Sequence, residues 1–167
     1  MRGSSVLLRS MSSSDKTPQP IPYDEENVFL KIIQGKLPCH RVFETEHAMA
    51  FLDAFPVADG HALLVPKKQG YASVMEMPAE EAALVLKELP RLCRAVRKAT
   101  NCEGVNIVAN SGKAAGQVVF HAHIHVVPRF EGDGAVKMGS RQASAGMLTK
   151  EQAEPVLERI KAALDEE

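Results

Sequence analysis

The chain has 167 residues, a formal net charge of −1 and a charged fraction of 25%. This length is typical of one domain with a sizeable core, and the near-neutral charge argues against a nucleic-acid-binding surface. No apolar run reaches the roughly 18 residues of a membrane-spanning helix, so we expect no membrane partner. The cysteines Cys39, Cys93 and Cys102 lack a Cys-x-x-Cys spacing, which predicts reduced thiols in a reducing compartment.

Residues 1–22 are rich in Ser, Thr and Pro and are predicted to form a disordered tail. Arg2 and Arg9 stand in a stretch without acidic residues, which is weakly similar to a mitochondrial presequence. We favour the alternative, a plain tail on a cytoplasmic protein.

A short helix is predicted over 28–34, because Asn27 can cap its start and Gly35 can end it. Three strands follow, over 41–44, 47–52 and 61–65. Asp53 comes directly after the second of these strands, where an aspartate is most often a turn residue. His61 opens the third, and without further context it is a core or capping histidine.

A long helix is predicted over 79–98, with a continuous apolar stripe at helical spacing that we interpret as core. Pro90 is expected to kink this helix. The fourth strand, over 104–109, is followed by Asn110.

Residues 110–117 form a loop of small residues that leads into the next strand. Its glycines, Gly112 and Gly116, let the backbone approach a ligand closely and turn its N–H groups inward. Such a loop suits a bound phosphate, although Asn-Ser-Gly is also ordinary turn chemistry.

The next stretch is predicted to be a strand over 118–127, ended by Pro128. His121, His123 and His125 stand at every second position, so a strand would place them on one face. Three explanations compete: buried structural histidines, a zinc site, or covalent catalysis at phosphorus by the middle histidine. The preceding loop favours catalysis, because a metal site does not need a phosphate cradle.

The remaining chain is predicted to contain a Gly- and Ser-rich loop over 131–145 and a helix that ends near residue 164. The segment 148–152 has capping-box form, and Pro155 is expected to delay the start of the helix. We therefore predict one domain over 23–130, with residues 131–167 packed on it.

The motif His121-Ala122-His123-Ile124-His125-Val126-Val127 resembles the His-φ-His-φ-His-φ-φ signature of the histidine triad (HIT) superfamily. The similarity extends over about 28–129 and is closest to the HINT-like branch and the bacterial HIT hydrolases. The resemblance implies an α+β fold with a five-stranded, mostly antiparallel sheet, a short N-terminal helix, one long helix on the sheet and a C-terminal helix. It also implies a homodimer and no cofactor.

The resemblance further implies roles for individual residues. His123 would attack the α-phosphorus of a nucleotide, and His125 would hold the phosphoryl oxygens together with Asn110 and the backbone near Gly116, Gln117 and Val118. His121 and His61 would fix the ring tautomer of His123. Asp53 would bind the ribose, beside Ala54. The base would lie against Phe29, Ile32, Phe51 and Leu63.

The activity implied is hydrolysis of purine nucleoside 5′-phosphoramidates or related conjugates through a nucleotidyl-histidine. The alternatives are a dinucleoside polyphosphate hydrolase, a weakly active nucleotide-binding regulator and a metalloenzyme.

Two departures from the family pattern matter. Asn27, Leu30 and Gln69 stand where some relatives carry zinc ligands, so we expect no metal. Val118 stands where many relatives have a Ser or Thr hydroxyl that assists the leaving group.

Overall fold

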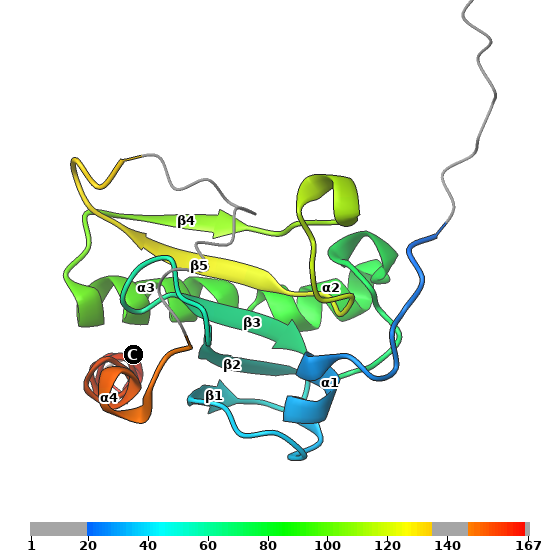
Figure 1. The fold of residues 1–167 in the computed structure, drawn as a ribbon, viewed down its shortest axis with the longest axis horizontal. Coiled ribbons are helices and arrows are strands. Elements are labelled where there is room, and N and C mark those ends of the chain that lie inside the picture. The colour runs from blue at the N-terminus through cyan, green and yellow to red at the C-terminus, as the bar shows by residue number, and fades with distance from the viewer. Residues whose placement is uncertain (1–19, 135–146, 166–167) are drawn as a thin grey trace, which may run out of the picture.

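The computed structural model describes residues 20–134 and 147–165. Its centre is a five-stranded antiparallel sheet in the order β1-β2-β3-β5-β4 (Figure 1). The strands are β1 (Arg41–Glu44), β2 (Ala48–Leu52), β3 (Ala62–Pro66), β4 (Gly104–Val108) and β5 (Ile124–Arg129). The helices are α1 (Val28–Ile33), α2 (Ala79–Leu86), α3 (Leu89–Thr100) and α4 (Lys150–Asp165). The predicted α+β architecture with this sheet is confirmed.

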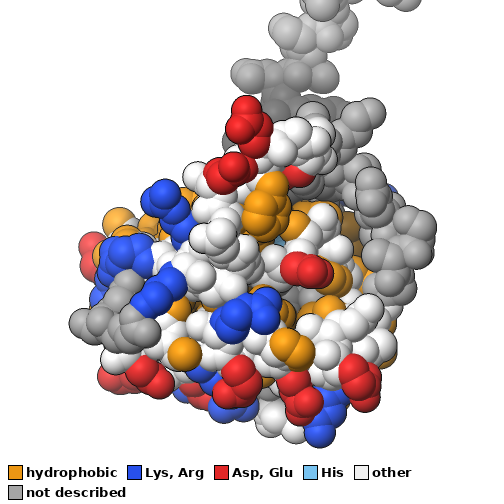
Figure 2. Space-filling model, turned by 90° about the vertical axis from the view of Figure 1, so that its left-hand side faces the viewer, with side chains coloured by type: hydrophobic (Ala, Val, Ile, Leu, Met, Phe, Trp, Pro, Cys, Tyr) orange, Lys and Arg blue, Asp and Glu red, His pale blue; other side chains and the backbone are white. Residues whose placement is uncertain are grey.

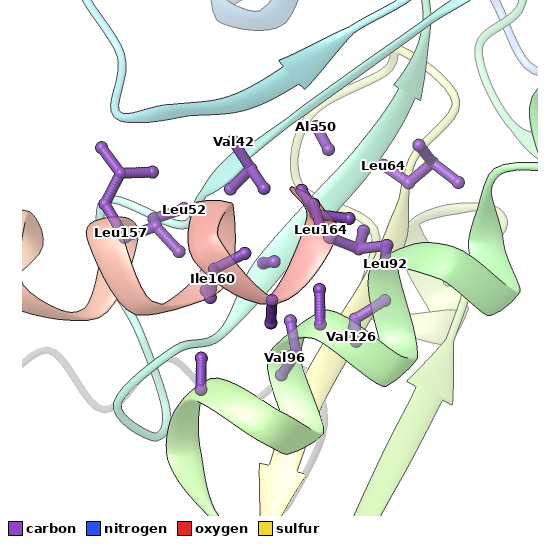
Figure 3. Close-up of a cluster of buried hydrophobic side chains, with 14 of the residues drawn as sticks. Val42, Ala50, Leu52, Leu64, Leu92, Val96, Val126, Leu157, Ile160 and Leu164 are labelled. Atoms are coloured by element: carbon purple, nitrogen blue, oxygen red, sulfur yellow. The ribbon is translucent and has the colours of Figure 1, made fainter. Parts of the chain in front are cut away.

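Strands β2 and β3 are buried on both faces, and their side chains divide by alternation. Ala50, Leu52 and Leu64 pack into the larger core, where Leu92 and Val96 of α3 and Ile160 and Leu164 of α4 meet the sheet (Figure 3). Met49, Phe51, Leu63 and Val65 face the other way and join Ile32 of α1 in a second cluster. The sheet therefore carries its main helices on one face and α1 on the other.

The short helix α1 forms as predicted. The Asn27 side chain accepts a hydrogen bond from Leu30 N–H at 2.8 Å, and Asn27 itself is buried. Gly35 follows the helix with a φ of 72°, a left-handed conformation that suits glycine. The cap fixes the point at which the chain turns into the helix that covers the second cluster.

The predicted long helix is two helices, α2 and α3, separated at residues 87–88. Pro90 lies in the first turn of α3 and has no N–H. Its ring would collide with the carbonyl of Leu86, four residues earlier, and Leu86 is the last residue of α2. The proline thus breaks the helix where only a kink was expected.

The predicted strand over 118–127 is wrong at its start, because β5 begins at Ile124. The last pair between β3 and β5 joins Leu64 to Ile124. The pairing does not continue toward Pro66, because Pro66 has no N–H and its carbonyl accepts a hydrogen bond from the His121 ring. His121 and His123 therefore lie in irregular chain that leads into β5, and His125 lies within the strand.

The end of β5 also differs from the prediction, since Pro128 lies inside the strand. Pro128 pairs with Val105 of β4. The register with β3 has already ended at Val126, so the missing proline N–H interrupts no ladder on that side.

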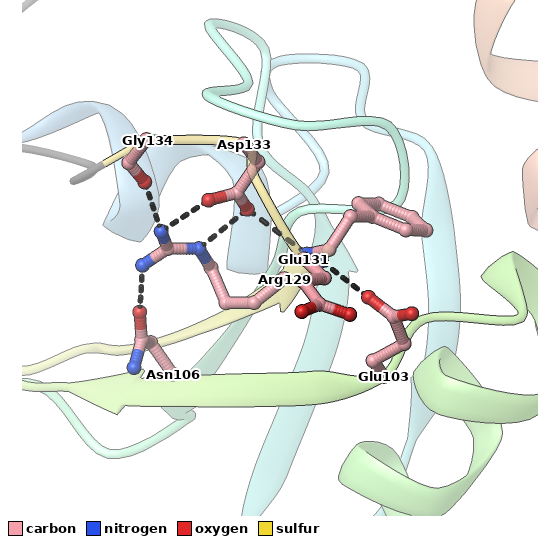
Figure 4. Close-up of polar contacts among 7 residues, drawn as sticks. Glu103, Asn106, Arg129, Glu131, Asp133 and Gly134 are labelled. Carbon is pink, nitrogen blue, oxygen red and sulfur yellow. Dashed lines mark hydrogen bonds and ion pairs between the residues drawn. The ribbon is translucent and has the colours of Figure 1, made fainter.

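Arg129, the last residue of β5, holds the turn that follows the strand (Figure 4). Its guanidinium donates to both carboxylate oxygens of Asp133, at 2.8 and 2.6 Å, and to Asn106 and the Gly134 carbonyl. This pairing lowers the pKa of Asp133 to about 2 and ties the turn over 130–134 to the edge of the sheet.

The C-terminal helix α4 has the predicted capping box, in which Thr149 and Gln152 exchange hydrogen bonds. Pro155 lies within the helix, so the expected delay of its start is wrong.

Of the disordered tail predicted over residues 1–22, residues 1–19 lie outside the described residues, as does most of the predicted loop over 131–145. In the part of the chain that is described, no helix is both long and apolar enough to cross a bilayer. Acidic and basic side chains are interspersed on the face shown in Figure 2.

Candidate active site

His61 and His125 form a hydrogen-bonded pair at the end of the sheet. His125 lies on β5 opposite Leu63, and His61 immediately precedes β3. The distance from His61 Nε2 to His125 Nδ1 is 2.9 Å. Val57 N–H donates to His61 Nδ1 at 3.3 Å, so the proton of the His61 ring is on Nε2. His61 therefore donates to His125, and the proton of His125 is left on its own Nε2.

His123 has its tautomer fixed by the main chain. Its Nδ1 lies 2.7 Å from the His121 carbonyl, which can only accept, so Nδ1 carries the proton and Nε2 keeps its lone pair. The ring is held edge-on by Phe29 and His125, at centroid distances of 5.1 and 4.9 Å. The prediction that His121 fixes this tautomer is confirmed, through its backbone carbonyl, whereas the prediction for His61 is wrong, since the His61 ring bonds to His125.

His121 is fully buried, with an exposed fraction of 0%. Its Nε2–H donates to the Pro66 carbonyl at 2.9 Å, and its Nδ1 accepts from the Tyr23 hydroxyl at 2.8 Å. Both ring nitrogens are thus used within the protein, so neither is free to bond to another molecule. Sequence reasoning missed Tyr23 because it lies at the edge of the Ser- and Pro-rich N-terminal segment, where no pattern marks it.

The environment keeps these imidazoles uncharged. Burial lowers the pKa of His61 to about 4 and that of His125 to about 3, and neighbouring imidazoles add to the effect. Burial likewise lowers the pKa of His121 and His123. At neutral pH His123 is therefore in the form that can act as a nucleophile.

Asp53 lies just past β2, and its side chain has 18% of its surface exposed. One carboxylate oxygen accepts from Phe55 N–H at 2.9 Å, which is the turn contact that its position suggests. The other lies 3.6 Å from His61 Nδ1 and 3.9 Å from His125 Nδ1. Burial raises the pKa of this carboxyl. The next residue, Ala54, is exposed, and its carbonyl accepts from Leu148 N–H.

Asp53, His61 and His125 could also hold a metal ion, because one donor atom from each lies within 4.8 Å of the others. The ring nitrogens near Asp53 already have partners, since His61 Nδ1 accepts from Val57 N–H and His125 Nδ1 accepts from His61. The absence of a metal stays a prediction.

The small-residue loop is closed on itself. Gly112 and Gly116 have φ values of 88° and 87°, which explains the glycines, and they flank a short 3₁₀ turn over Lys113–Ala115. The N–H groups of Gly116 and Gln117 donate to carbonyls of this turn, at 3.0 and 3.1 Å. Among the described residues the Val118 N–H donates no hydrogen bond. Of the three residues whose backbone N–H groups were predicted to bind phosphate, only Val118 therefore keeps its N–H without a partner among the described residues.

Gln117 is buried and acts as a brace. Its side-chain oxygen accepts from Gly112 N–H at 2.7 Å, and its amide nitrogen donates to the carbonyls of Ala72 and Val119. Its side chain is therefore committed within the protein. Asn110 is partly buried and stands two residues beyond Val108, which pairs with His125.

The predicted apolar base pocket lies on the α1 face of the sheet. Ile32, Phe51 and Leu63 are buried in the second cluster, and the half-buried Phe29 packs on it. Phe29 contacts both Phe51 and His123 with its ring edge-on, so the cluster borders the triad. The structure thus brings together His61, His123, His125, Asp53 and this apolar wall.

The neutral, aligned imidazoles at the end of an antiparallel sheet define a histidine-triad site. A family model described as HIT domain matches residues 34–132. The chain is 35% identical over 147 residues to adenylylsulfatase HINT3 of Arabidopsis thaliana, covering 88% of this chain and 74% of that protein. It is 34% identical over 117 residues to adenosine 5′-monophosphoramidase HNT1 of Saccharomyces cerevisiae, covering 70% and 71%. The chain therefore belongs to the HIT family.

A solved structure agrees with this assignment. The Hit-like protein involved in cell-cycle regulation from Bartonella henselae superposes with a TM-score of 0.75 at 32% identity. The match covers 84% of this chain and 98% of that one.

Proposed function

We propose that this protein hydrolyses purine nucleoside 5′-phosphoramidates or related nucleotide conjugates through a nucleotidyl-histidine intermediate. The observation that carries the proposal is the hydrogen bond from His123 Nδ1–H to the His121 carbonyl, which leaves the Nε2 lone pair for attack. The names of two relatives, an adenylylsulfatase and an adenosine 5′-monophosphoramidase, support a substrate of this class.

In the first step His123 Nε2 forms a bond to the α-phosphorus, and the bond from phosphorus to the leaving group breaks. In the second step water attacks the same phosphorus, the N–P bond breaks, and the nucleoside monophosphate is released. His125 Nε2–H, Asn110 and the Val118 N–H would donate to the non-bridging oxygens. One fixed donor of this kind lowers the barrier by about 3 kcal/mol.

The nucleoside would lie across the α1 face. The exposed part of the Asp53 carboxylate would accept hydrogen bonds from the ribose hydroxyls, beside Ala54. Phe29 would contact the base directly, with Ile32, Phe51 and Leu63 behind it, because Phe29 is the half-buried member of this wall. An apolar wall selects by shape, so a purine ring would gain more contact than a pyrimidine.

We also propose a homodimer. Strand β4 is an edge of the sheet, and its Ile107 has 53% of its surface exposed. Size-exclusion chromatography with light scattering would give the oligomeric state directly.

The test is to replace His123 with Ala and to measure AMP release from adenosine phosphoramidate. We expect a loss of more than a thousandfold, since the covalent step needs this nitrogen. The matched control is His47→Ala, which removes a partly exposed imidazole at the end of β2 opposite to Asp53 and should keep full activity. Activity of His123→Ala within tenfold of the parent would contradict the role of this residue. A binding protein with vestigial activity would bind AMP and yet yield no covalent adduct with adenosine phosphoramidate after an alkaline quench, in which an N–P bond to histidine survives.

A second candidate substrate is a mixed anhydride such as adenylyl sulfate, or a dinucleoside polyphosphate. Val118 has 70% of its surface exposed and offers no hydroxyl to protonate a leaving amine. Sulfate and phosphate leave as stable anions and do not need that proton. The similarity to an adenylylsulfatase points the same way.

The Val118→Ser variant distinguishes the two candidates. If amine departure limits turnover, the added hydroxyl should raise kcat/KM for adenosine phosphoramidate by about tenfold and leave adenylyl sulfate nearly unchanged. Val118→Ala, which removes bulk without adding a donor, is the control.

A further inference from the structure

The N-terminal segment around Tyr23 reaches the site from outside the family-model match, which begins at residue 34. Figure 1 shows this segment entering next to α1. The Tyr23 hydroxyl lies 2.8 Å from His121 Nδ1, across 98 residues of sequence. Two residues earlier, the Ile21 side chain lies 3.6 Å from where a Cβ on Gly112 would stand. The segment therefore contacts both the triad region and the small-residue loop.

We propose that Tyr23 is a positioning residue for the nucleophile, acting on His123 through His121. The inference rests on the proposed function, because it concerns the efficiency of that reaction. The path has two hydrogen bonds: Tyr23 O–H donates to the His121 ring, and the His121 carbonyl accepts from His123 Nδ1–H.

The direction of the first bond follows from the second ring nitrogen. His121 Nε2 lies 2.9 Å from the Pro66 carbonyl, which can only accept, so Nε2 carries the proton and Nδ1 must accept. Because His121 is fully buried, its Nδ1 needs a donor from the protein, and the Tyr23 hydroxyl supplies it. Loss of the hydroxyl would leave a buried acceptor unsatisfied and favour a shift of the ring.

Such a shift would reach His123 because residues 118–123 are held by few contacts. They precede β5 and have no sheet ladder of their own. The bonds that fix them are the Gln117 brace to Val119, the Ala122 N–H to the Tyr71 carbonyl at 2.7 Å, and the two bonds of the His121 ring. Tyr23, which lies outside the sheet, supplies one of the two bonds of the His121 ring.

The experiment compares Tyr23→Phe with Tyr71→Phe, a change at the other tyrosine of the chain. The Tyr71 ring faces the exposed Lys68, with its centroid 5.8 Å from Lys68 Nζ. We expect Tyr23→Phe to lower kcat for adenosine phosphoramidate about tenfold with KM within twofold of the parent, and Tyr71→Phe to change neither. Histidine ¹⁵N shifts should show a changed His121 Nδ1 resonance in Tyr23→Phe alone, because Nδ1 loses its donor while the Pro66 carbonyl still holds the proton on Nε2.

Phenylalanine keeps the ring that packs against His121, and a thermal melt confirms that the variant is folded. Parent activity together with a Tyr23→Phe kcat within twofold, or an unchanged His121 Nδ1 resonance, would overturn the inference and leave the proposed function standing. A parent protein with no turnover of any nucleotide conjugate would overturn the proposed function, and the inference with it.

Discussion

His61 Nε2 donates to His125 Nδ1 at 2.9 Å, and this bond decides which nitrogen of His125 faces outward with a proton. Val57 N–H holds the other end of the pair by donating to His61 Nδ1. A backbone group thus sets the state of two imidazoles in sequence, and His125 Nε2–H becomes a fixed donor at the site.

The pair predicts a graded response to substitution at His61. His61→Ala removes the donor to His125, so both tautomers of His125 become accessible, and we expect kcat to fall about a hundredfold. His61→Gln can place an amide N–H near the former Nε2 and should keep kcat within about tenfold of the parent. Steady-state kinetics of both variants test this. A kcat for His61→Ala within twofold of the parent would mean that His125 does not depend on its partner.

The lowered pKa values predict a loss of stability on acidification. The pKa values in the folded state are about 4 for His61 and about 3 for His125, against 6.5 for an ordinary histidine. The unfolded chain binds more protons between these values, so the free energy of unfolding is highest above pH 6.5 and decreases as the pH falls toward 3. At pH 5 the loss is about 2 kcal/mol for each ring.

Urea unfolding at pH 7.5 and pH 5 measures this loss. The His61→Ala variant is the control, because it lacks one of the two rings and should lose about 2 kcal/mol less over the same interval. Asp53, whose pKa is raised, acts in the opposite direction and is common to both proteins. An equal pH dependence in both proteins would contradict the assignment.

Several elements could be predicted because their causes are local. Asn27 caps α1 through a residue three positions away, and the alternation in β2 needs only the pattern of its own side chains. The start of β5 could not be predicted in this way. It depends on the Pro66 carbonyl being taken by the His121 ring, a contact between residues 55 positions apart.

The candidate site likewise has a part that the sequence predicts and a part that it does not. The triad, Asp53 and the apolar wall follow from the motif and its resemblance to a family. The Tyr23 contact does not, since no residue near Tyr23 in sequence indicates that a buried imidazole lacks a donor. The sequence also could not show that the N–H groups of Gly116 and Gln117 donate to carbonyls of their own turn. A glycine-rich loop that offers its N–H groups to a ligand has the same composition as one that pairs them internally.

Gln117 provides a prediction about the loop. Gln117→Glu keeps the shape but replaces the amide nitrogen, which donates to the Ala72 and Val119 carbonyls, with an oxygen that repels them. We expect the free energy of unfolding to fall by about 3 kcal/mol and kcat to fall with it. The control Gln69→Glu makes the same chemical change at an exposed position and should stay within about 0.5 kcal/mol of the parent. If chemical denaturation gives equal stabilities for the two variants, Gln117 is not the brace of this loop.

Phe29 tests the position of the nucleotide base. Its half-buried ring lies edge-on to both Phe51 and His123, so it could serve the base, the nucleophile or both. If it contacts the base, Phe29→Ala should raise KM about tenfold and leave kcat within about threefold, because the lost contact exists before and during reaction. Val28→Ala, on the exposed side of the same helix, should change neither constant. A fall in kcat at constant KM would instead mean that Phe29 holds the His123 ring, and the base would then have to lie elsewhere along the α1 face.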